Sequence, residues 1–291
     1  GSSIRTYELW ARWVTLETFT PFMRTHHSGT PAPNLQRSSN EDTLRHYRDY
    51  GRWHQRLLPY WMQVVDEAVT KGAPAVRPVW WNEPDPTSLF DVDDAFLVGN
   101  NLLVAPIVTE GQTSRPVSLP SGTWHRWPSV DVLSSTALSG TITVDDVGIE
   151  DSVVFVRGGA VVPMLRQHFD TTAQFDGPLD EGIQGAPEVM DEIVLRLVPG
   201  GDDSGSLDDA SFGKITYTFS GASLGTEAME VAGAGPCSDT VQTGCMDGNA
   251  YYLSLDGSEQ TVGLKAGTAS GSLEISGDFP GRVRIELFSG S

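Results

Sequence analysis

Residues 19–27 read Phe19-Thr20-Pro21-Phe22-Met23-Arg24-Thr25-His26-His27, and this stretch decides the fold. Its apolar residues predict a β-strand that ends at Arg24 and His26, which places hydrogen-bonding side chains at the strand's carboxyl end. Helix-like segments flank it, over residues 8–16 and from residue 41 to residue 72. Helix, strand, helix is the order of the last units of a (β/α)8 barrel, whose active-site face lies at the carboxyl ends of the strands.

The second helix-like segment carries its own start and stop signals. The stretch Ser39-Asn40-Glu41-Asp42 supplies an N-cap and the acidic residues of the first turn, and Gly72 can end the helix. Between them, apolar residues recur at three- and four-residue spacing. Pro59 lies inside the segment and predicts a kink or a division into two helices.

From residue 74 the apolar period changes to two. Short apolar runs alternate with turn residues up to residue 165, which predicts an antiparallel sandwich. After an irregular stretch over residues 166–187 the strand pattern returns and predicts a second sandwich. We therefore expect a mixed, mostly β chain with three units: barrel-type residues 1–73, a proximal β-sandwich over residues 74–165 and a distal β-sandwich over residues 166–291.

Several motifs together resemble glycoside hydrolase family 31, the α-glucosidase family. The resemblance covers roughly residues 1–165, and the Met23-to-His26 form is similar to that of its sulfoquinovosidase-like bacterial members. The motifs occur in the family's order, and they are Phe22-x-Arg24-x-His26, Arg56-Leu57-Leu58-Pro59-Tyr60, Arg77-Pro78 with Trp80, the run from Asp91 to Pro106, Leu119-Pro120-Ser121-Gly122-Thr123-Trp124 and the run from Val154 to Pro163.

The resemblance implies the carboxyl-terminal portion of a retaining α-glycosidase that works without a cofactor. Family members use two aspartates, in a Trp-x-Asp-x-Asn-Glu stretch and a Gly-Asp-Asn stretch, and neither stretch occurs in this sequence. Trp81-Asn82-Glu83 matches only the end of the first and is interpreted as structural. We therefore assign no catalytic residue here, expect the chain alone to be inactive, and expect its partners to be an upstream part of the same enzyme and an α-glycoside.

The resemblance also implies roles for the residues of the opening stretch. His26 corresponds to the family's sugar-binding histidine, although a lone histidine can equally pack at a strand end. Arg24 is interpreted as an ion-pair partner that orients the site rather than as a direct ligand. Phe22 is assigned to barrel packing, with contact to the sugar as the alternative. These three residues form the predicted substrate-binding set.

Other residue clusters have structural alternatives. The acidic residues Asp91, Asp93 and Asp94 invite a metal site, but they run straight into a predicted strand and are assigned to turn chemistry. The stretch from Asp202 to Asp209 is the better calcium candidate, yet we predict no metal. A set of tryptophans could stack on sugars or form the core, and core packing is the preferred interpretation; its members are Trp80, Trp81, Trp124 and Trp127.

The composition excludes some partners. A formal net charge of -19 argues against nucleic acid and against an anionic membrane surface, because both need a basic face. Cys237 and Cys245 lie close together in an acidic, lysine-poor region, which indicates one disulfide and an exported, secreted or periplasmic protein, with free thiols as the alternative.

Two other functions stay open at this stage. A transglycosylase of the same family would use the same machinery as the hydrolase. A non-catalytic carbohydrate-binding or scaffold protein would keep the barrel units only as structure. The presence or absence of the two aspartates in the preceding gene sequence would separate the catalytic functions from the non-catalytic one.

Overall fold

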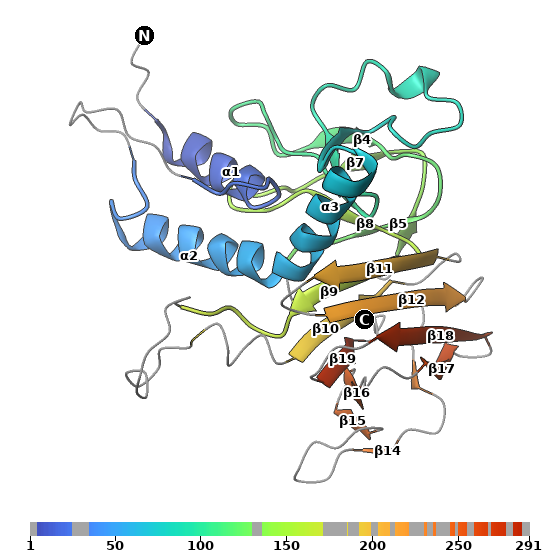
Figure 1. Ribbon diagram of the computed structural model, residues 1–291. Helices are drawn as coiled ribbons and strands as arrows, with labels where there is room; N and C mark the ends of the chain where they lie inside the picture. Colours follow the sequence, from blue (N-terminus) through green and yellow to red (C-terminus); the bar gives the residue numbers. More distant parts are fainter. Residues whose placement is uncertain are drawn as a thin grey trace.

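A computed structural model gives three α-helices followed by strands (Figure 1). The residues it describes are 5–24, 35–129, 136–170, 185, 192–198, 203–209, 213–220, 230–231, 235–236, 245–247, 250–254, 259–266, 269–277 and 282–286. The mostly β prediction, with helices first and sandwiches after them, is confirmed. No helix in the described ranges has the length and apolar character that crossing a membrane requires.

Helix α1 (Tyr7–Glu17) forms where the sequence predicts it. The side chain of Thr6 caps it by accepting a hydrogen bond from the backbone N–H of Leu9 at 3.2 Å. One face of α1, with Trp10, Ala11 and Val14, is buried. Figure 1 shows α1 beside α2, the two helices that open the chain.

The predicted strand after α1 is wrong over its described part. Residues 18–21 form turns and bends, in which the N–H groups of Phe19 and Thr20 bond back to the carbonyls of Leu16 and Glu17 at 3.0 and 3.1 Å, and residues 22–24 have no regular secondary structure. A barrel strand obtains its hydrogen bonds from neighbouring strands, and no described strand pairs with this segment. Local bonds satisfy its backbone instead. Residues 25–27, including His26, lie outside the described residues.

The next two helices, α2 (Glu41–Arg56) and α3 (Leu58–Lys71), confirm the predicted division at Pro59. Asn40 caps α2 in a reciprocal capping box with Thr43. Pro59 occupies the first turn of α3, where its missing N–H is harmless. Gly72 ends α3 in the left-handed conformation with φ +70°.

The first sandwich follows α3. One of its sheets has six strands in the order β1-β2-β3-β8-β5-β6, and the other consists of β4 and β7. A short 3₁₀ helix, Thr87–Leu89, precedes β2. The strands are β1 (Val76–Pro78), β2 (Phe96–Val98), β3 (Leu102–Val104), β4 (Arg115–Ser118), β5 (Trp124–Arg126), β6 (Ala137–Leu138), β7 (Thr141–Val144) and β8 (Val154–Arg157).

The second sandwich also has two sheets. Their orders are β14-β15-β16-β19-β10-β9 and β11-β12-β18-β17-β13, antiparallel apart from the β10–β19 and β14–β15 pairs. The strands are β9 (Val161–Leu165), β10 (Glu192–Leu197), β11 (Asp203–Asp209), β12 (Gly213–Ser220), β13 (Glu230–Val231), β14 (Gly235–Pro236), β15 (Cys245–Asp247), β16 (Ala250–Ser254), β17 (Glu259–Ala266), β18 (Ala269–Gly277) and β19 (Arg282–Glu286).

The strand β9 connects the two sandwiches. Its apolar pattern places it with residues 74–165, yet it pairs with β10 at the edge of the first of these sheets. Pro163 fits there, because an edge strand can spare one N–H. The division of the chain at residues 73 and 165 stays a prediction.

The helices join both sandwiches through one hydrophobic cluster. It includes Phe19 from the turn, Trp53 and Tyr60 from the helices, and Trp127 and Val194 from the β-domains. The hydroxyl of Tyr60 donates to the carbonyl of Val98 at 2.7 Å, which ties α3 to β2. The guanidinium of the buried Arg77 pairs with Glu67 of α3 at 2.5 Å. The junction is therefore packed like a domain interior.

Candidate functional site

Of the three predicted substrate-binding residues, the structure describes Arg24 and Phe22. Arg24 lines a cavity of about 360 Å³ beside α1. The side chain of Phe22 is 85% exposed and does not line this cavity, so the predicted barrel packing of Phe22 is absent from the described fold. Of the phenylalanines in the opening stretch, Phe19 is the one that is buried. The role of His26 stays a prediction.

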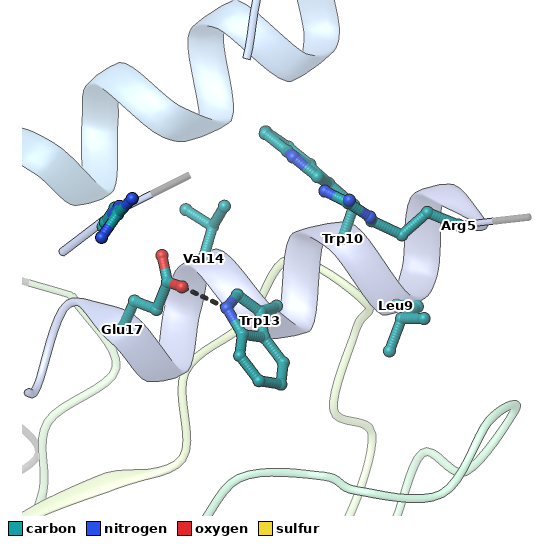
Figure 2. Close-up of a pocket in the computed structure, with 7 residues that line it drawn as sticks. Arg5, Leu9, Trp10, Trp13, Val14 and Glu17 are labelled. Atoms are coloured by element: carbon teal, nitrogen blue, oxygen red, sulfur yellow. Dashed lines mark hydrogen bonds between the residues drawn. The ribbon is translucent and has the colours of Figure 1, made fainter. Parts of the chain in front are cut away.

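Helix α1 forms one wall of the cavity (Figure 2). Leu9, Trp13 and Glu17 follow each other at four-residue spacing and so form one row along the helix. Trp10 and Val14 form the adjacent row, while Arg5 and Arg24 approach from before and after the helix; these residues complete the lining. The wall is therefore mostly apolar, with charged groups at its ends.

Glu17 is the carboxylate of this cavity, and it is only 9% exposed. The indole N–H of Trp13 donates to its Oε1, drawn as a dashed line in Figure 2. Its Oε2 is buried without a hydrogen-bond partner in the part of the chain that the structure describes. Burial raises the pKa of Glu17, opposed by the Trp13 bond, by a backbone bond from Arg24 and by the charge of Arg5.

This arrangement sets limits on the chemistry of the cavity. A retaining glycosidase needs two carboxyl groups about 5–5.5 Å apart across the glycosidic bond. The residues that line the cavity include one carboxylate, Glu17. Trp13, which is 58% exposed, can offer a flat apolar face to a partner. The lining described here can thus support binding but does not by itself supply a pair of carboxyl groups.

Sequence reasoning did not select Glu17, Trp13 or Arg5. The signal for Glu17 was present, because a carboxylate four residues after a tryptophan lies beside it on a helix. The predicted helix over residues 8–16 stopped one residue before Glu17. Whether that carboxylate is solvated or buried depends on the turn that brings Arg24 back to α1.

Among the acidic residues before β2, Asp94 contacts a distant strand, β4, rather than its own turn. Its carboxylate pairs with Arg115 at 2.7 Å, and Arg115 also donates to the carbonyl of Asp94 at 3.0 Å. The described residues hold no group of three or more potential metal ligands. The calcium candidate begins at Asp202, outside the described residues, and residues 203–209 form strand β11, whose side chains are likewise outside the description.

The tryptophans and the Trp81-Asn82-Glu83 stretch have mostly structural surroundings. Trp124 and Trp127 are fully buried, as core packing predicts, whereas Trp81 is 39% exposed. Asn82 donates to Asn100 at 2.6 Å, and Glu83 accepts hydrogen bonds from the backbone N–H and hydroxyl of Ser121 at 3.1 Å. These contacts join loops of the first sandwich.

The predicted disulfide is not tested. Cys237 lies outside the described residues, as does the side chain of Cys245 in β15. No disulfide is found in the part of the chain that the structure covers. The bridge and the export that we inferred from it remain predictions.

Two family models match consecutive parts of the chain. Residues 2–64 match the family 31 glycosyl hydrolase TIM-barrel domain. Residues 72–162 match the glycosyl hydrolase family 31 C-terminal domain. The first match covers α1, α2 and the start of α3, and the second covers the first sandwich.

Curated relatives agree with these matches. A sulfoquinovosidase from Agrobacterium fabrum is 36% identical over 127 residues, which are 43% of this chain and 19% of that protein. Human neutral alpha-glucosidase AB is 31% identical over 198 residues, 66% of this chain and 20% of that protein. The chain thus spans about a fifth of the length of these relatives.

Solved structures share the fold. A cycloalternan-forming enzyme from Listeria monocytogenes superposes with a TM-score of 0.63 at 18% identity, covering 100% of this chain and 29% of that one. A Flavobacterium johnsoniae dextranase superposes with a TM-score of 0.59 at 19% identity, covering 92% and 37%. At these identities the likeness concerns the fold.

Proposed function

Because the chain belongs to glycosyl hydrolase family 31, we propose that it takes part in the retaining hydrolysis of α-linked glycosides. The observation that carries the proposal is the order of the two family matches, barrel then C-terminal domain, across helices and a sandwich that share one packed core. In this proposal the chain provides the end of the barrel and the β-domains that support it.

The carboxylates of the reaction would come from a barrel segment that precedes these residues. One aspartate would attack the anomeric carbon and form a glycosyl-enzyme, while the other would protonate the leaving oxygen and then activate water. His26 would hydrogen-bond a sugar hydroxyl, and Arg24 would orient the site. No cofactor enters this chemistry.

The outer side of α1 supports docking of such a segment. Leu9 and Trp13 are 50% and 58% exposed, and Phe22 after the turn is 85% exposed. Large apolar side chains that cluster on a surface mark interaction sites. In a (β/α)8 barrel each helix covers the sheet, so we propose that strands of the upstream barrel segment pack on this face.

The experiment compares the chain alone with the chain joined to its upstream gene segment. We expect the joined protein to release p-nitrophenol from p-nitrophenyl α-glycosides, and the 291-residue chain to release none. Steady turnover by the purified chain alone would contradict the proposal that the catalytic carboxylates lie in the upstream segment. An inactive joined protein that lacks both aspartates would favour the non-catalytic carbohydrate-binding or scaffold alternative.

The site assignment has its own test in the joined protein. Replacing His26 by alanine should lower kcat/KM about a hundredfold, because hydrogen bonds to the sugar tighten in the transition state. His27→Ala is the matched control and should change kcat/KM little, with melting temperature unchanged in both variants. Near-full activity of His26→Ala would show that His26 is a packing residue.

Hydrolysis and transglycosylation are separated by their products. An isomaltosyltransferase from Sporosarcina globispora is also a relative, 28% identical over 170 residues. A transglycosylase would extend an added oligosaccharide, whereas the proposed hydrolase would release free sugar. Product analysis at high acceptor concentration distinguishes the two.

We further propose that the protein is exported and carries the Cys237–Cys245 bridge.

A further inference from the structure

The segment after α1, residues 18–24, is anchored by apolar contacts at its start and near its end. Phe19 is fully buried, and its ring lies 4.9 Å from that of Trp53 at an angle of 85°. Met23 packs against the apolar cluster of α1 that includes Trp10. The segment is therefore held against the helices although no described strand pairs with it.

Polar contacts to the same segment come from Glu17, the last residue of α1. Its carbonyl accepts hydrogen bonds from the backbone N–H of Thr20 at 3.1 Å and from the Thr20 hydroxyl at 2.9 Å. That hydroxyl also lies 3.0 Å from the carbonyl of Phe22. The carboxylate of Glu17 accepts a hydrogen bond from the backbone N–H of Arg24. One residue thus bonds to the middle of the segment through its main chain and to the end through its side chain.

The carboxylate of Glu17 is itself fixed. Glu17 is only 9% exposed, and the indole N–H of Trp13, one turn earlier on α1, donates to its Oε1. Its Oε2 has no hydrogen-bond partner among the residues that the structure describes. Burying a carboxylate with one oxygen unpaired lowers stability, so the stability of the fold does not explain a glutamate at this position. Ionisable groups that are perturbed by burial cluster at functional sites.

Arg24, which this carboxylate contacts, belongs to the predicted substrate-binding set. It lines the same cavity as Glu17. Its side chain is exposed, so the place of its guanidinium depends mainly on where the backbone of residue 24 lies. The contact from Glu17 acts directly on that backbone.

We propose that Glu17 is a positioning residue, whose carboxylate holds the backbone of Arg24 against α1 and so fixes the place of the Arg24 side chain in the substrate site. This inference rests on the proposed function, in which Arg24 orients the site. Glu17 contacts neither the sugar nor the reacting atoms in this proposal. Its effect on the rate comes from placement, because a shift of about 1 Å in a positioned group can cost on the order of a hundredfold.

Hydrogen–deuterium exchange of the Arg24 amide in the 291-residue chain tests the contact without any activity. Glu17→Ala should raise its exchange rate about tenfold, because an amide without its acceptor exchanges with solvent. Unchanged exchange at Arg24 would overturn the proposal.

Glu8→Ala is the matched control for this exchange experiment. Like Glu17, Glu8 bonds to a side chain four residues away on α1 and to a backbone N–H outside the helix. Its partners are Arg12 at 2.9 Å and the N–H of Gly111 at 2.8 Å. Glu8→Ala should raise exchange at Gly111 and leave Arg24 unchanged. Equal increases at Arg24 in the two variants would show a general loosening of α1 and refute a specific role of Glu17.

A conservative variant separates positioning from charge in the chain joined to its upstream segment. Glu17→Ala should lower kcat/KM about tenfold. Glu17→Gln should restore most of this loss, because the carboxamide oxygen still accepts hydrogen bonds. Equal losses in the two variants would show that the negative charge is required, and would refute positioning through the accepted bond.

A double-mutant cycle tests whether Glu17 acts through Arg24. If it does, Glu17→Ala should cause no further loss of kcat/KM in an Arg24→Ala background. Additive losses would show that Glu17 acts through another group and would overturn the proposal. An inactive joined protein would overturn the proposed function, whereas unchanged exchange at Arg24 overturns only the positioning contact, so the two failures are distinguishable.

Discussion

The two sides of α1 differ in how completely they are packed. On the junction side, Ala11 and Thr15 are buried and do not line the cavity, and beyond them the helices share one core with both sandwiches. On the cavity side, Leu9 and Trp13 are half exposed beside a buried carboxylate. The junction is therefore packed like a protein interior, whereas the half-exposed apolar side chains on the cavity side are typical of an interface.

The pKa shifts of two glutamates show the same difference between the two sides. Glu150, on the junction side, accepts hydrogen bonds from Arg45 and Tyr7, and the Arg45 bond lowers its pKa. Glu17, on the cavity side, has one oxygen without a partner among the described residues, and burial raises its pKa. The surroundings of Glu150 favour its anion, whereas at Glu17 burial outweighs the hydrogen bonds and the Arg5 charge that favour the anion.

The largest effect should follow truncation at the junction. Trp127 is fully buried, with its ring 5.5 Å from that of Trp53 and the guanidinium of Arg196 5.4 Å above it. Trp127→Ala should lower the free energy of unfolding by about 3–5 kcal/mol, because it leaves a cavity between helices and sandwiches. Urea unfolding measures this.

Phe22→Ala is the matched aromatic control for Trp127→Ala. Its side chain is 85% exposed, so the free energy of unfolding should change by less than about 0.5 kcal/mol. Similar losses in the two variants would mean that the cavity side contributes to the fold as the junction does, and the comparison would fail.

An intermediate effect is expected at Gly99, where β2 approaches α3. Gly99 has φ +55°, and an added Cβ would lie 2.7 Å from Val64 Cγ2 and 2.8 Å from the Tyr60 hydroxyl oxygen. Gly111→Ala is the control, since Gly111 has φ +73° with no atom within 4 Å of the added carbon. The control should cost about 1–2 kcal/mol from backbone strain.

Gly99→Ala should cost about 1–3 kcal/mol more than the control, because α3 must move away from the sandwich. Thermal unfolding of both variants provides the comparison. Equal melting temperatures would indicate that α3 shifts without penalty and that the junction is looser than its burial implies.

The smallest and most specific effect concerns pH. The pKa of Glu150 lies below its ordinary value of 4.5, so its contribution to stability is present above that value and is lost as pH falls through the folded-state pKa. The pKa of Glu17 lies above 4.5, so stability is lost as pH rises through its folded-state pKa.

Two glutamine variants test these opposite pH dependences of stability separately. Glu150→Gln should lower stability at neutral pH by on the order of 1 kcal/mol and flatten the loss in acid. It should not abolish that loss, because burial also lowers the pKa of His46. Glu17→Gln should leave neutral stability equal or higher. Melting temperature against pH checks both, and equal curves would refute the electrostatic contrast.

Much of the fold was predictable because its signals are local. Asn40, Pro59 and Gly72 set helix ends through capping, ring geometry and left-handed backbone, and none of these needs a distant partner. The period-two runs predicted the sandwiches for the same reason. The family followed from ordered motifs, which are a property of the sequence.

Other features were decided only by tertiary structure, since they depend on what packs against a segment. Residues 19–24 have a strand's composition, yet no described strand pairs with them and they turn back on α1. Burial of Glu17 depends on that turn, and a cleft lined by α2 and residues 166–168 depends on segments that are more than a hundred positions apart. The sequence identifies the chemical group that each side chain carries. Its burial and the charges around it depend on neighbours that are distant in the sequence.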